Sequence, residues 1–311
     1  MYIYDKMKPD NSNIKTFSSI SQLMQHLGQP SPLHPLIALV NYDKTSFTAF
    51  EKNQKICIDF YKISFKTNFK GRVKYGQGYY DFEEGGLAFL KPKQIITSPD
   101  NEDSYEGYAL YFHPDFIRSY PLGSSINQYG FFSYAVSEGL FVSVKENIII
   151  SNLFKAMFIE LKNNMDHFSQ DVLVSQIELL LNYSNRFYNR QFITRRNINH
   201  DIITALDNLL DEYFIKDISL ENGFPSVDYV STKLNLSPRY LSDLLGSITG
   251  ENTQQYIQNK LIEHSKNLLS STSLSVSEIA FKLGFEHPQS FSKLFKIKTH
   301  QSPVKFRASF N

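Results

Sequence analysis

The sequence predicts a multidomain β + all-α protein: a β-barrel or β-sandwich domain, a helical connecting segment, and an all-α domain at the C-terminal end. Three observations lead to this fold class. The 311 residues are enough for about two domains. Apolar residues are spaced as in short strands from about residue 55 to 113, and as in amphipathic helices from residue 145 onward. We place the three parts at residues 1–140, 141–198 and 199–311.

In the N-terminal part, short apolar and aromatic runs are separated by glycine or proline. Short strands at this spacing are typical of a sandwich or small barrel. The runs that we expect to form strands are 56–60, 63–65, 73–75, 79–82, 87–90, 94–97 and 108–112.

Two amphipathic helices are predicted in the connecting segment. The apolar positions of the first are Ile149, Leu153, Met157 and Leu161, with Phe154 and Phe158 beside them. Those of the second are Leu173, Ile177, Leu180, Leu181, Ser184, Phe187 and Tyr188. Two interpretations stay open, since the pair can cover the barrel or dimerise with a second subunit. The latter part of 182–199 contains several arginines among polar residues and is predicted to be a linker.

An internal repeat organises the C-terminal part. Residues 226–236 align with 275–285, 49 positions on, and after a one-residue insertion Leu241 aligns with Phe291, 50 positions on. Each copy predicts a short helix, a tight turn and a second helix, which is the helix-turn-helix layout, at about 226–249 and 275–298. Paired helices of this size also occur in many α-helical bundles. The expected helices are 200–214, 226–234, 238–249, 253–269, 275–283 and 289–298.

Local signals support these helix boundaries. Ser226 and Ser275 can cap the first helices, and Ser237-Pro238 is a favourable helix start. Gly284 falls at a helix end, where a left-handed residue is favoured. The helix 253–269 that joins the two copies spans roughly 25 Å, comparable with the roughly 34 Å repeat of successive major grooves on one face of DNA.

Charge differs between the two copies. Residues 253–311 contain seven lysines and one arginine against three glutamates, a net charge of +5. Residues 221–252 contain two basic and four acidic residues, a net charge of −2. The second copy is therefore predicted to be the main electrostatic contact with DNA, with a solvated lysine-rich face as the alternative.

These motifs resemble the signature of AraC-type (AraC/XylS) transcriptional regulators over roughly residues 208–310. The matching segments are 236–241, Thr249-Gly250, 266–269, 275–296, Ser302-Pro303 and Arg307. The resemblance implies a sequence-specific regulator of transcription that binds double-stranded DNA. More loosely, the N-terminal part resembles the cupin-like sensory domain of that family. This implies a small-molecule effector, a homodimer, and contact with RNA polymerase.

The resemblance also implies which residues contact DNA. The expected base-reading residues are Arg239, Ser242 and Asp243 in the first motif, and Gln289, Ser290, Ser292 and Lys293 in the second. The expected phosphate contacts are Lys296, Lys298, Lys305 and Arg307. The expected core residues are Leu241, Leu244, Leu245, Phe285, Phe291, Leu294 and Phe295.

Three residues depart from the family pattern. His300 stands where the family usually has glycine, so a different turn is expected there. Gly246 replaces a usual lysine, which weakens one expected phosphate contact. Asp243 would repel DNA if it faced a phosphate instead of a base.

Composition and charge limit the other functions. The net charge of +1 excludes a uniformly basic protein, and the single cysteine, Cys57, excludes intrachain disulfides and a cysteine-rich zinc site. No signal peptide or membrane-spanning stretch is visible, so we expect a cytoplasmic protein with no membrane partner.

The N-terminal part shows no catalytic or metal-binding pattern, so we expect neither an enzyme nor a cofactor. The histidines at 26, 34, 113, 167, 200, 264, 287 and 300 form no His-x-His pair of the kind that metal-dependent cupins use. His113 is predicted to be a hydrogen-bonded structural residue. Five tyrosines either line a polar-aromatic cavity or pack in the core: Tyr61, Tyr75, Tyr79, Tyr80 and Tyr111. The alternative function is a small-molecule-binding or enzymatic cupin whose helical C-terminal region is only an assembly module.

Overall fold

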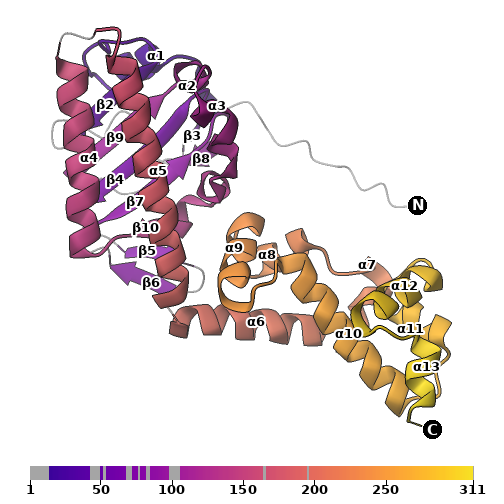
Figure 1. The fold of residues 1–311 in the computed structure, drawn as a ribbon. Helices are drawn as coiled ribbons and strands as arrows, with labels where there is room; N and C mark the ends of the chain where they lie inside the picture. Colours follow the sequence, from indigo (N-terminus) through magenta and orange to yellow (C-terminus); the bar gives the residue numbers. More distant parts are fainter. Residues whose placement is uncertain are drawn as a thin grey trace, which may run out of the picture. The chain divides into compact units, whose positions relative to one another are not determined.

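The chain forms two compact units, Met1–Gln191 and Phe192–Asn311, in a computed structural model (Figure 1). The structure describes residues 14–42, 50–51, 54–67, 72–75, 78–81, 85–97, 106–163, 166–194 and 196–310. The division between the units falls inside the segment 141–198. Among the described residues, no helix is both long and apolar enough to cross a membrane.

The first unit is built around two sheets and a separate β-hairpin. The strands are β1 (Ile14–Phe17), β2 (Ile37–Asn41), β3 (Lys55–Ile58), β4 (Tyr61–Thr67), β5 (Arg72–Tyr75), β6 (Gly78–Asp81), β7 (Gly86–Leu90), β8 (Ile95–Thr97), β9 (Glu106–Phe112) and β10 (Leu140–Phe141). The larger, antiparallel sheet has the order β10-β7-β4-β9-β2. The smaller sheet has the order β1-β3-β8, with β1 parallel to β3, and β5 pairs with β6. All seven predicted runs form strands, which confirms the β-rich N-terminal part.

Apolar side chains from both sheets share one core. Ile56 and Ile58 of β3 lie in the same cluster of buried residues as Val40 of β2 and Tyr111 of β9. The cluster also includes side chains of the helix α1 (Ile20–His26), which the sequence analysis did not predict. The strands β1, β2 and β10 were missed as well. Strand β2 is buried on both faces, so its apolar residues form a run without the alternation that marks a half-exposed strand.

Two long helices, α4 (Val144–Lys162) and α5 (Ser169–Thr194), lie side by side over one face of the larger sheet (Figure 1). The ring of Phe154 stacks on Phe65 of β4 at 5.5 Å and on Tyr108 of β9 at 5.6 Å. All seven residues of the predicted apolar face of α5 are buried. These faces therefore pack within the unit, as one of the two interpretations held.

Two predictions for this segment were wrong in detail. In α4 the buried face contains Ile150 together with Phe154, Met157 and Leu161, so Ile149 and Leu153 are only half-buried. The predicted linker is also helical, because α5 continues to Thr194 and the next helix begins at Arg196. Arg186 and Arg190 of this segment lie within α5.

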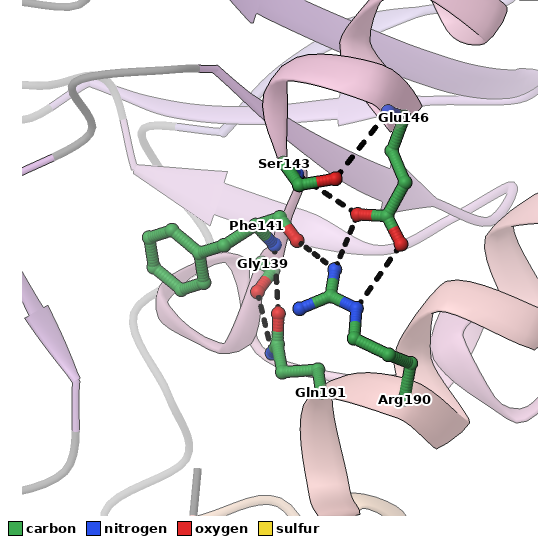
Figure 2. Close-up of polar contacts among 6 residues, drawn as sticks. All are labelled: Gly139, Phe141, Ser143, Glu146, Arg190 and Gln191. Carbon is green, nitrogen blue, oxygen red and sulfur yellow. Dashed lines mark hydrogen bonds and ion pairs between the residues drawn. The ribbon is translucent and has the colours of Figure 1, made fainter. Parts of the chain in front are cut away.

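A polar cluster holds the end of α5 to the first unit (Figure 2). The guanidinium of Arg190 contacts both carboxylate oxygens of Glu146, at 2.6 and 3.1 Å, and donates to the carbonyl of Phe141 at 2.8 Å. The side chain of Gln191 accepts from the Phe141 amide at 2.8 Å and donates to the Gly139 carbonyl at 3.3 Å. Glu146 also accepts a hydrogen bond from the amide of Ser143, which caps α4. The last turns of α5 are thus bound to β10 and to the start of α4.

Between β9 and α4 the chain forms only short helical turns. These are α2 (Pro114–Ile117), α3 (Pro121–Ser125), η3 (Ile126–Gln128), η4 (Gly130–Ser133) and η5 (Val136–Glu138). Phe131 and Phe132 of η4 are buried against Phe89 of β7, at ring distances of 4.3 and 5.6 Å. These turns therefore extend the core of the first unit beyond the sheets.

The second unit is entirely helical. Its helices are α6 (Arg196–Ile215), α7 (Ile218–Asn222), α8 (Val227–Lys233), α9 (Pro238–Thr249), α10 (Thr253–Ser271), α11 (Val276–Lys282), α12 (Pro288–Thr299) and α13 (Pro303–Ala308). Asp207 of α6 accepts a hydrogen bond from Tyr256 of α10 at 2.7 Å and pairs with Lys260 at 2.8 Å. These contacts make α6 part of the second unit. All six predicted helices are present, whereas the short helices α7 and α13 were not predicted.

Candidate nucleic-acid interface

The repeat in the sequence is a repeat in the structure. Helices α8 and α11 have seven residues each, and helices α9 and α12 have twelve residues each. Ser226 and Ser275 cap the first helix of each copy, and Ser237 caps α9, as predicted. The turn residues also correspond, because Asn235 and Gly284 both adopt a left-handed conformation, with φ of 56° and 86°. Two helix-turn-helix motifs therefore lie in one unit.

The turn at His300 does not differ from its counterpart in the first motif, contrary to the expectation from the sequence. His300 follows α12 with φ 60° and ψ 11°, and Gly250 follows α9 with φ 78° and ψ 5°. Both amides donate to the carbonyl four residues before them. Histidine thus adopts a conformation that glycine adopts at lower energy. Having histidine at this position therefore raises the energy of the turn and leaves its backbone conformation the same.

The short helix α7 supports the second motif. Asp217, which precedes α7, forms an ion pair with Lys282 of α11, and the Ser219 hydroxyl donates to the Lys282 carbonyl at 2.5 Å. The backbones of Gly223 and Gly284 are in close contact, so a Cβ at Gly284 would lie 2.4 Å from the carbonyl carbon of Gly223. This contact requires glycine at 284, in addition to the left-handed conformation that the sequence predicted.

The first candidate recognition helix, α9, buries one face and presents another to solvent. Tyr240, Leu241, Leu244 and Leu245 are buried. The three predicted base-reading residues lie on the opposite stripe, where Arg239 is exposed and Ser242 and Asp243 are half-buried. Arg239 and Asp243 form an ion pair, with 3.0 Å between Nε and Oδ2. The positive charge of this stripe is therefore neutralised within the helix.

An acid and a base four residues apart on a helix commonly pair, so the sequence did contain the signal for this interaction. Its consequence is that Asp243 holds Arg239 in the free protein. Gly246 follows on the same stripe and is exposed, and a Cβ added at this position would have no heavy atom within 4 Å. Space for the missing lysine is thus present.

The second candidate recognition helix, α12, has a different electrostatic character. Phe291 and Phe295 are buried, whereas Gln289, Ser290 and Lys293 are exposed and Ser292 is half-buried. In the described part of the chain, neither Lys293 nor Lys296 has an acidic partner. Uncompensated positive charge on an exposed helix is what a phosphate backbone attracts. The two motifs therefore differ as the net charges indicated.

The four predicted phosphate contacts lie in different environments. Lys296 and Lys305 are exposed, and Lys298 is half-buried. Arg307 of α13 is turned inward, because its Nε donates to the carbonyl of Leu269 near the end of α10 at 3.0 Å. One terminal nitrogen of Arg307 is buried without a partner among the described residues. This geometry favours a role for Arg307 in holding α13 against α10.

Most of the core predicted for the two motifs is confirmed. Leu241, Leu244, Leu245, Phe291 and Phe295 have no exposed surface. Phe285 and Leu294 are half-buried instead. Phe285 packs at the edge of this core, with its ring tilted at 5.5 Å from that of Phe291 and at 6.1 Å from that of Phe224.

The structure places the candidate polar residues of the first unit as follows. His113 caps α2 and accepts a hydrogen bond from the amide of Asp115 at 3.2 Å, as its structural interpretation predicted. Tyr61 packs on Phe112 and Phe132, on the helix-covered side of the sheet, whereas Tyr111 belongs to the core between the sheets. These two tyrosines therefore do not line one cavity. The side chains of Tyr75, Tyr79 and Tyr80 lie outside the described residues. No group of three or more potential metal ligands occurs among the described residues.

Two family models match the chain. Residues 230–309 match a helix-turn-helix domain, and residues 55–179 match an AraC-like ligand-binding domain. The first match contains both helix-turn-helix motifs apart from the start of α8. The second contains β3 to β9, α4 and the first turns of α5.

Similar curated proteins are regulators with the same type of motif. The chain is 30% identical over 149 residues to the HTH-type transcriptional regulator YfiF of Bacillus subtilis, covering 48% of this chain and 44% of that protein. It is 27% identical over 110 residues to the HTH-type regulator YijO of Escherichia coli, covering 35% and 36%. The matches thus span less than half the length of these relatives.

A solved structure is similar to part of the chain. It is the C-terminal domain of the two-component response regulator yesN from Fusobacterium nucleatum, which is 29% identical. The similarity covers 34% of this chain and 98% of that domain, with a TM-score of 0.30.

Proposed function

Because the chain belongs to the AraC-type transcriptional regulators, we propose that it binds double-stranded DNA sequence-specifically and regulates transcription in response to a small molecule. The observation that carries this proposal is the pair of helix-turn-helix motifs, each of which buries an apolar face of its second helix and leaves the predicted base-reading residues exposed or half-buried. In such motifs the second helix lies in the major groove. Here these helices are α9 and α12.

The two motifs have unequal tasks in this proposal. Helix α12 supplies most of the binding energy, because Lys293 and Lys296 are exposed and without an acidic partner among the described residues. Helix α9 contributes selectivity, because Arg239 reaches a base only if its ion pair with Asp243 opens or if both residues contact one base pair together. A guanidinium donates to guanine and a carboxylate accepts from cytosine, so the pair matches the two sides of a G·C pair.

We propose that the effector acts through the first unit and that α5 transmits its effect. Arg190 and Gln191 are held by the first unit. The next residue of the helix, Phe192, belongs to the second unit, where its ring packs against that of Tyr240 of α9 at 5.2 Å. An effector that favours one arrangement of the end of α5 would therefore shift the population of DNA-binding states.

We further propose that the outer surface of α4 and α5 forms a homodimer. Val144, Ile148 and Ile159 are exposed on α4, and Val172 and Leu179 are exposed on α5. The outer side of α4 also carries the exposed lysines 145, 155 and 162, whereas α5 carries the acidic residues 171 and 178. A two-fold axis can place α4 of one subunit against α5 of the other. The exposed apolar residues of the two helices would then contact each other, and the lysines of α4 would lie near the acidic residues of α5.

The DNA-binding proposal is tested with the full-length protein and a random DNA pool, by fluorescence anisotropy and sequencing of the bound fraction. We expect an enriched motif and an affinity that falls with log salt by about 0.9 per phosphate neutralised. Lys293→Ala should cost about 1–3 kcal/mol at the selected site and relax specificity. Lys296→Ala should weaken binding to all sequences evenly and flatten the salt slope.

Lys216→Ala is the matched control, because this exposed lysine of the same unit lies outside both motifs and pairs with Glu212. If Lys293→Ala binds every sequence as the wild type does, α12 is not a recognition helix. The alternative function, an enzymatic cupin with an assembly module, predicts no DNA binding at low salt with or without added effectors. For the dimer, Ile148→Glu should give a monomer in light scattering, and an unchanged mass would refute the proposed surface.

A further inference from the structure

The two helix-turn-helix motifs are connected in two ways. Helix α10 joins them along the chain, since it lies between α9 and α11 in the sequence. The second connection consists of residues 199–223, which form most of α6, the whole of α7 and the residue after it. We call these residues the brace. Lobes joined through one helix can rotate about the residues at its ends, whereas a second connection restricts that rotation.

The brace contacts both helices of the first motif. The buried side chain of Asn199 donates to the carbonyl of Phe192 at 2.5 Å, and the Phe192 ring packs against that of Tyr240 in α9 at 5.2 Å. Further along α6, the ring of Tyr213 lies 5.1 Å from that of Tyr229 in α8. The beginning of α6 is therefore bound to α9 through Phe192, and its last turn contacts α8.

The brace is also bound to α10 at two levels. Asp207, in the middle of α6, accepts a hydrogen bond from Tyr256 at 2.7 Å and pairs with Lys260 at 2.8 Å. Near the end of α6, the buried ring of Phe214 stacks on that of His264 at 5.3 Å. Contacts at two levels of α10 restrict both sliding and tilting of α6 against it.

The brace holds the second motif at Lys282, the last residue of α11. Asp217 forms an ion pair with the ammonium of Lys282, and the Ser219 hydroxyl donates to its carbonyl at 2.5 Å. A carbonyl in the last turn of a helix has no partner within the helix, and Ser219 supplies one. The side chains of Lys282 and Asp217 are 32% and 40% exposed, so water screens this ion pair only in part. Both ends of Lys282 are thus bound to the start of α7.

A further contact supports the turn inside the second motif. Tyr213 is buried, and its hydroxyl donates to the carbonyl of Gly223 at 2.9 Å. Gly223 in turn lies against the backbone of Gly284, which forms the turn after α11. Tyr213 therefore contacts the first motif with its ring and supports the second through its hydroxyl.

We propose that the brace fixes the separation of α9 and α12, and that Asp217 is a positioning residue that determines which spacing between two DNA segments the protein accepts. This inference rests on the proposed function, because it concerns how both recognition helices read one DNA site. Each base pair inserted between the segments moves one of them by about 3.4 Å and rotates it by about 35°. A unit with a fixed separation cannot follow that change, whereas a unit that can rotate about the ends of α10 can.

The first test compares two DNA duplexes with the full-length protein. One carries the sequence selected from the random pool, and the other has one base pair inserted between its two read segments. In the wild type the insertion should weaken binding at least about tenfold, as for the loss of one base-pair contact. In Asp217→Asn, and in Lys282→Met, this penalty should fall to about threefold or less.

The variants are chosen so that folding and positioning can be told apart. Asparagine tolerates the left-handed conformation of residue 217, where φ is 54°, so Asp217→Asn removes the charge and keeps the backbone. Glu212→Gln is the matched control, because it breaks an ion pair with Lys216 that stays on the surface of α6 and reaches neither motif. It should keep the wild-type penalty. Circular dichroism melts establish that each variant is folded.

The second test measures the separation of the helices without DNA. Cys57→Ser removes the natural thiol, and spin labels are attached at Gly246→Cys in α9 and Ile297→Cys in α12, two exposed positions. An excess of unlabelled protein leaves one labelled subunit in any dimer. Pulsed electron–electron double resonance should give one narrow distance distribution, which becomes broader when Asp217→Asn is added and stays narrow with Glu212→Gln.

The proposal is overturned if Asp217→Asn keeps the narrow distribution, or if it weakens binding to both duplexes equally and leaves the insertion penalty unchanged. A selected sequence with a single read segment would also overturn it. If no DNA sequence is selected but the distribution broadens in Asp217→Asn, the regulator proposal fails and the brace stands. If DNA is selected and the insertion penalty is indifferent to Asp217, only this inference fails.

Discussion

Gly284 is the position where we expect a single added carbon to destabilise the second helix-turn-helix motif most. The substitution Gly284→Ala has two costs. Its φ of 86° lies in the left-handed region, which costs an L-residue about 1–2 kcal/mol. The new Cβ would also lie 2.4 Å from the carbonyl carbon and 2.7 Å from the oxygen of Gly223, and 2.8 Å from the amide nitrogen of Phe224.

These neighbours are backbone atoms, so no side chain can turn aside to make room. The turn before α8 must move away from α11, and forced shifts of this kind cost about 1–3 kcal/mol. We therefore expect Gly284→Ala to lower the free energy of unfolding of the second unit by about 3 kcal/mol. Gly250→Ala is the matched control, because φ there is 78° but nothing lies within 4 Å of the added Cβ. It should cost only about 1 kcal/mol.

Hydrogen exchange followed by mass spectrometry resolves this difference within the second unit. In peptides covering α7, α11 and α12, amide exchange should accelerate roughly 100-fold in Gly284→Ala and less than about tenfold in Gly250→Ala, since 1.4 kcal/mol corresponds to a factor of ten. Equal acceleration in the two variants would show that the contact with Gly223 contributes nothing. Wild-type exchange in Gly284→Ala would refute both parts of the reasoning.

Four other outcomes follow from the same structure. His300→Gly should stabilise the second unit by about 1 kcal/mol in the same exchange experiment, because glycine adopts the left-handed conformation of this residue without the steric cost that histidine has. A loss of stability would mean that the imidazole makes a stabilising contact. Arg190→Met and Glu146→Gln should each destabilise the first unit by about 2 kcal/mol, because the two paired side chains are only 33% and 13% exposed. The double variant should cost less than the sum of the two, and strict additivity in denaturant titrations would exclude coupling across this ion pair. Gly246→Lys should raise DNA affinity and steepen the salt dependence by about 0.9, whereas Gly246→Ala, which only strengthens the helix, should leave the slope unchanged. Burial lowers the pKa of His264, whose ring stacks on Phe214, so the folded state binds its proton less tightly than the unfolded state. The free energy of unfolding should therefore fall as the pH drops below 6.5, and His264→Phe should lack this part of the pH dependence in denaturant titrations.

Local spacing was enough to predict the order of most elements. The period of apolar residues separated strands from helices, and the offset of 49 residues between Ser226 and Ser275 located both motifs. Caps such as Ser237-Pro238 fixed helix starts, because the residues that satisfy free backbone amides are adjacent in sequence. The ion pair of Arg239 with Asp243 is equally local and was available to the same reasoning.

Elements without a complete period were missed. Helices α7 and α13 have five and six residues, too few to display an apolar stripe, and they are held by tertiary contacts such as Arg307 with the Leu269 carbonyl. The linker predicted in the latter part of 182–199 was wrong for a similar reason. Its polar side chains Arg190 and Gln191 are satisfied by β10 and α4, some 50 residues away in the sequence.

The sequence by itself determined the fold class, the two repeated motifs and the stripes of residues that α9 and α12 present. Those properties depend on periodicity and on capping, which act between near neighbours in the chain. Only the tertiary structure decided that Arg307 turns inward and that Gly284 contacts Gly223. Periodicity shows which residues share a face, but what that face meets depends on segments far apart in the chain, which only folding brings together.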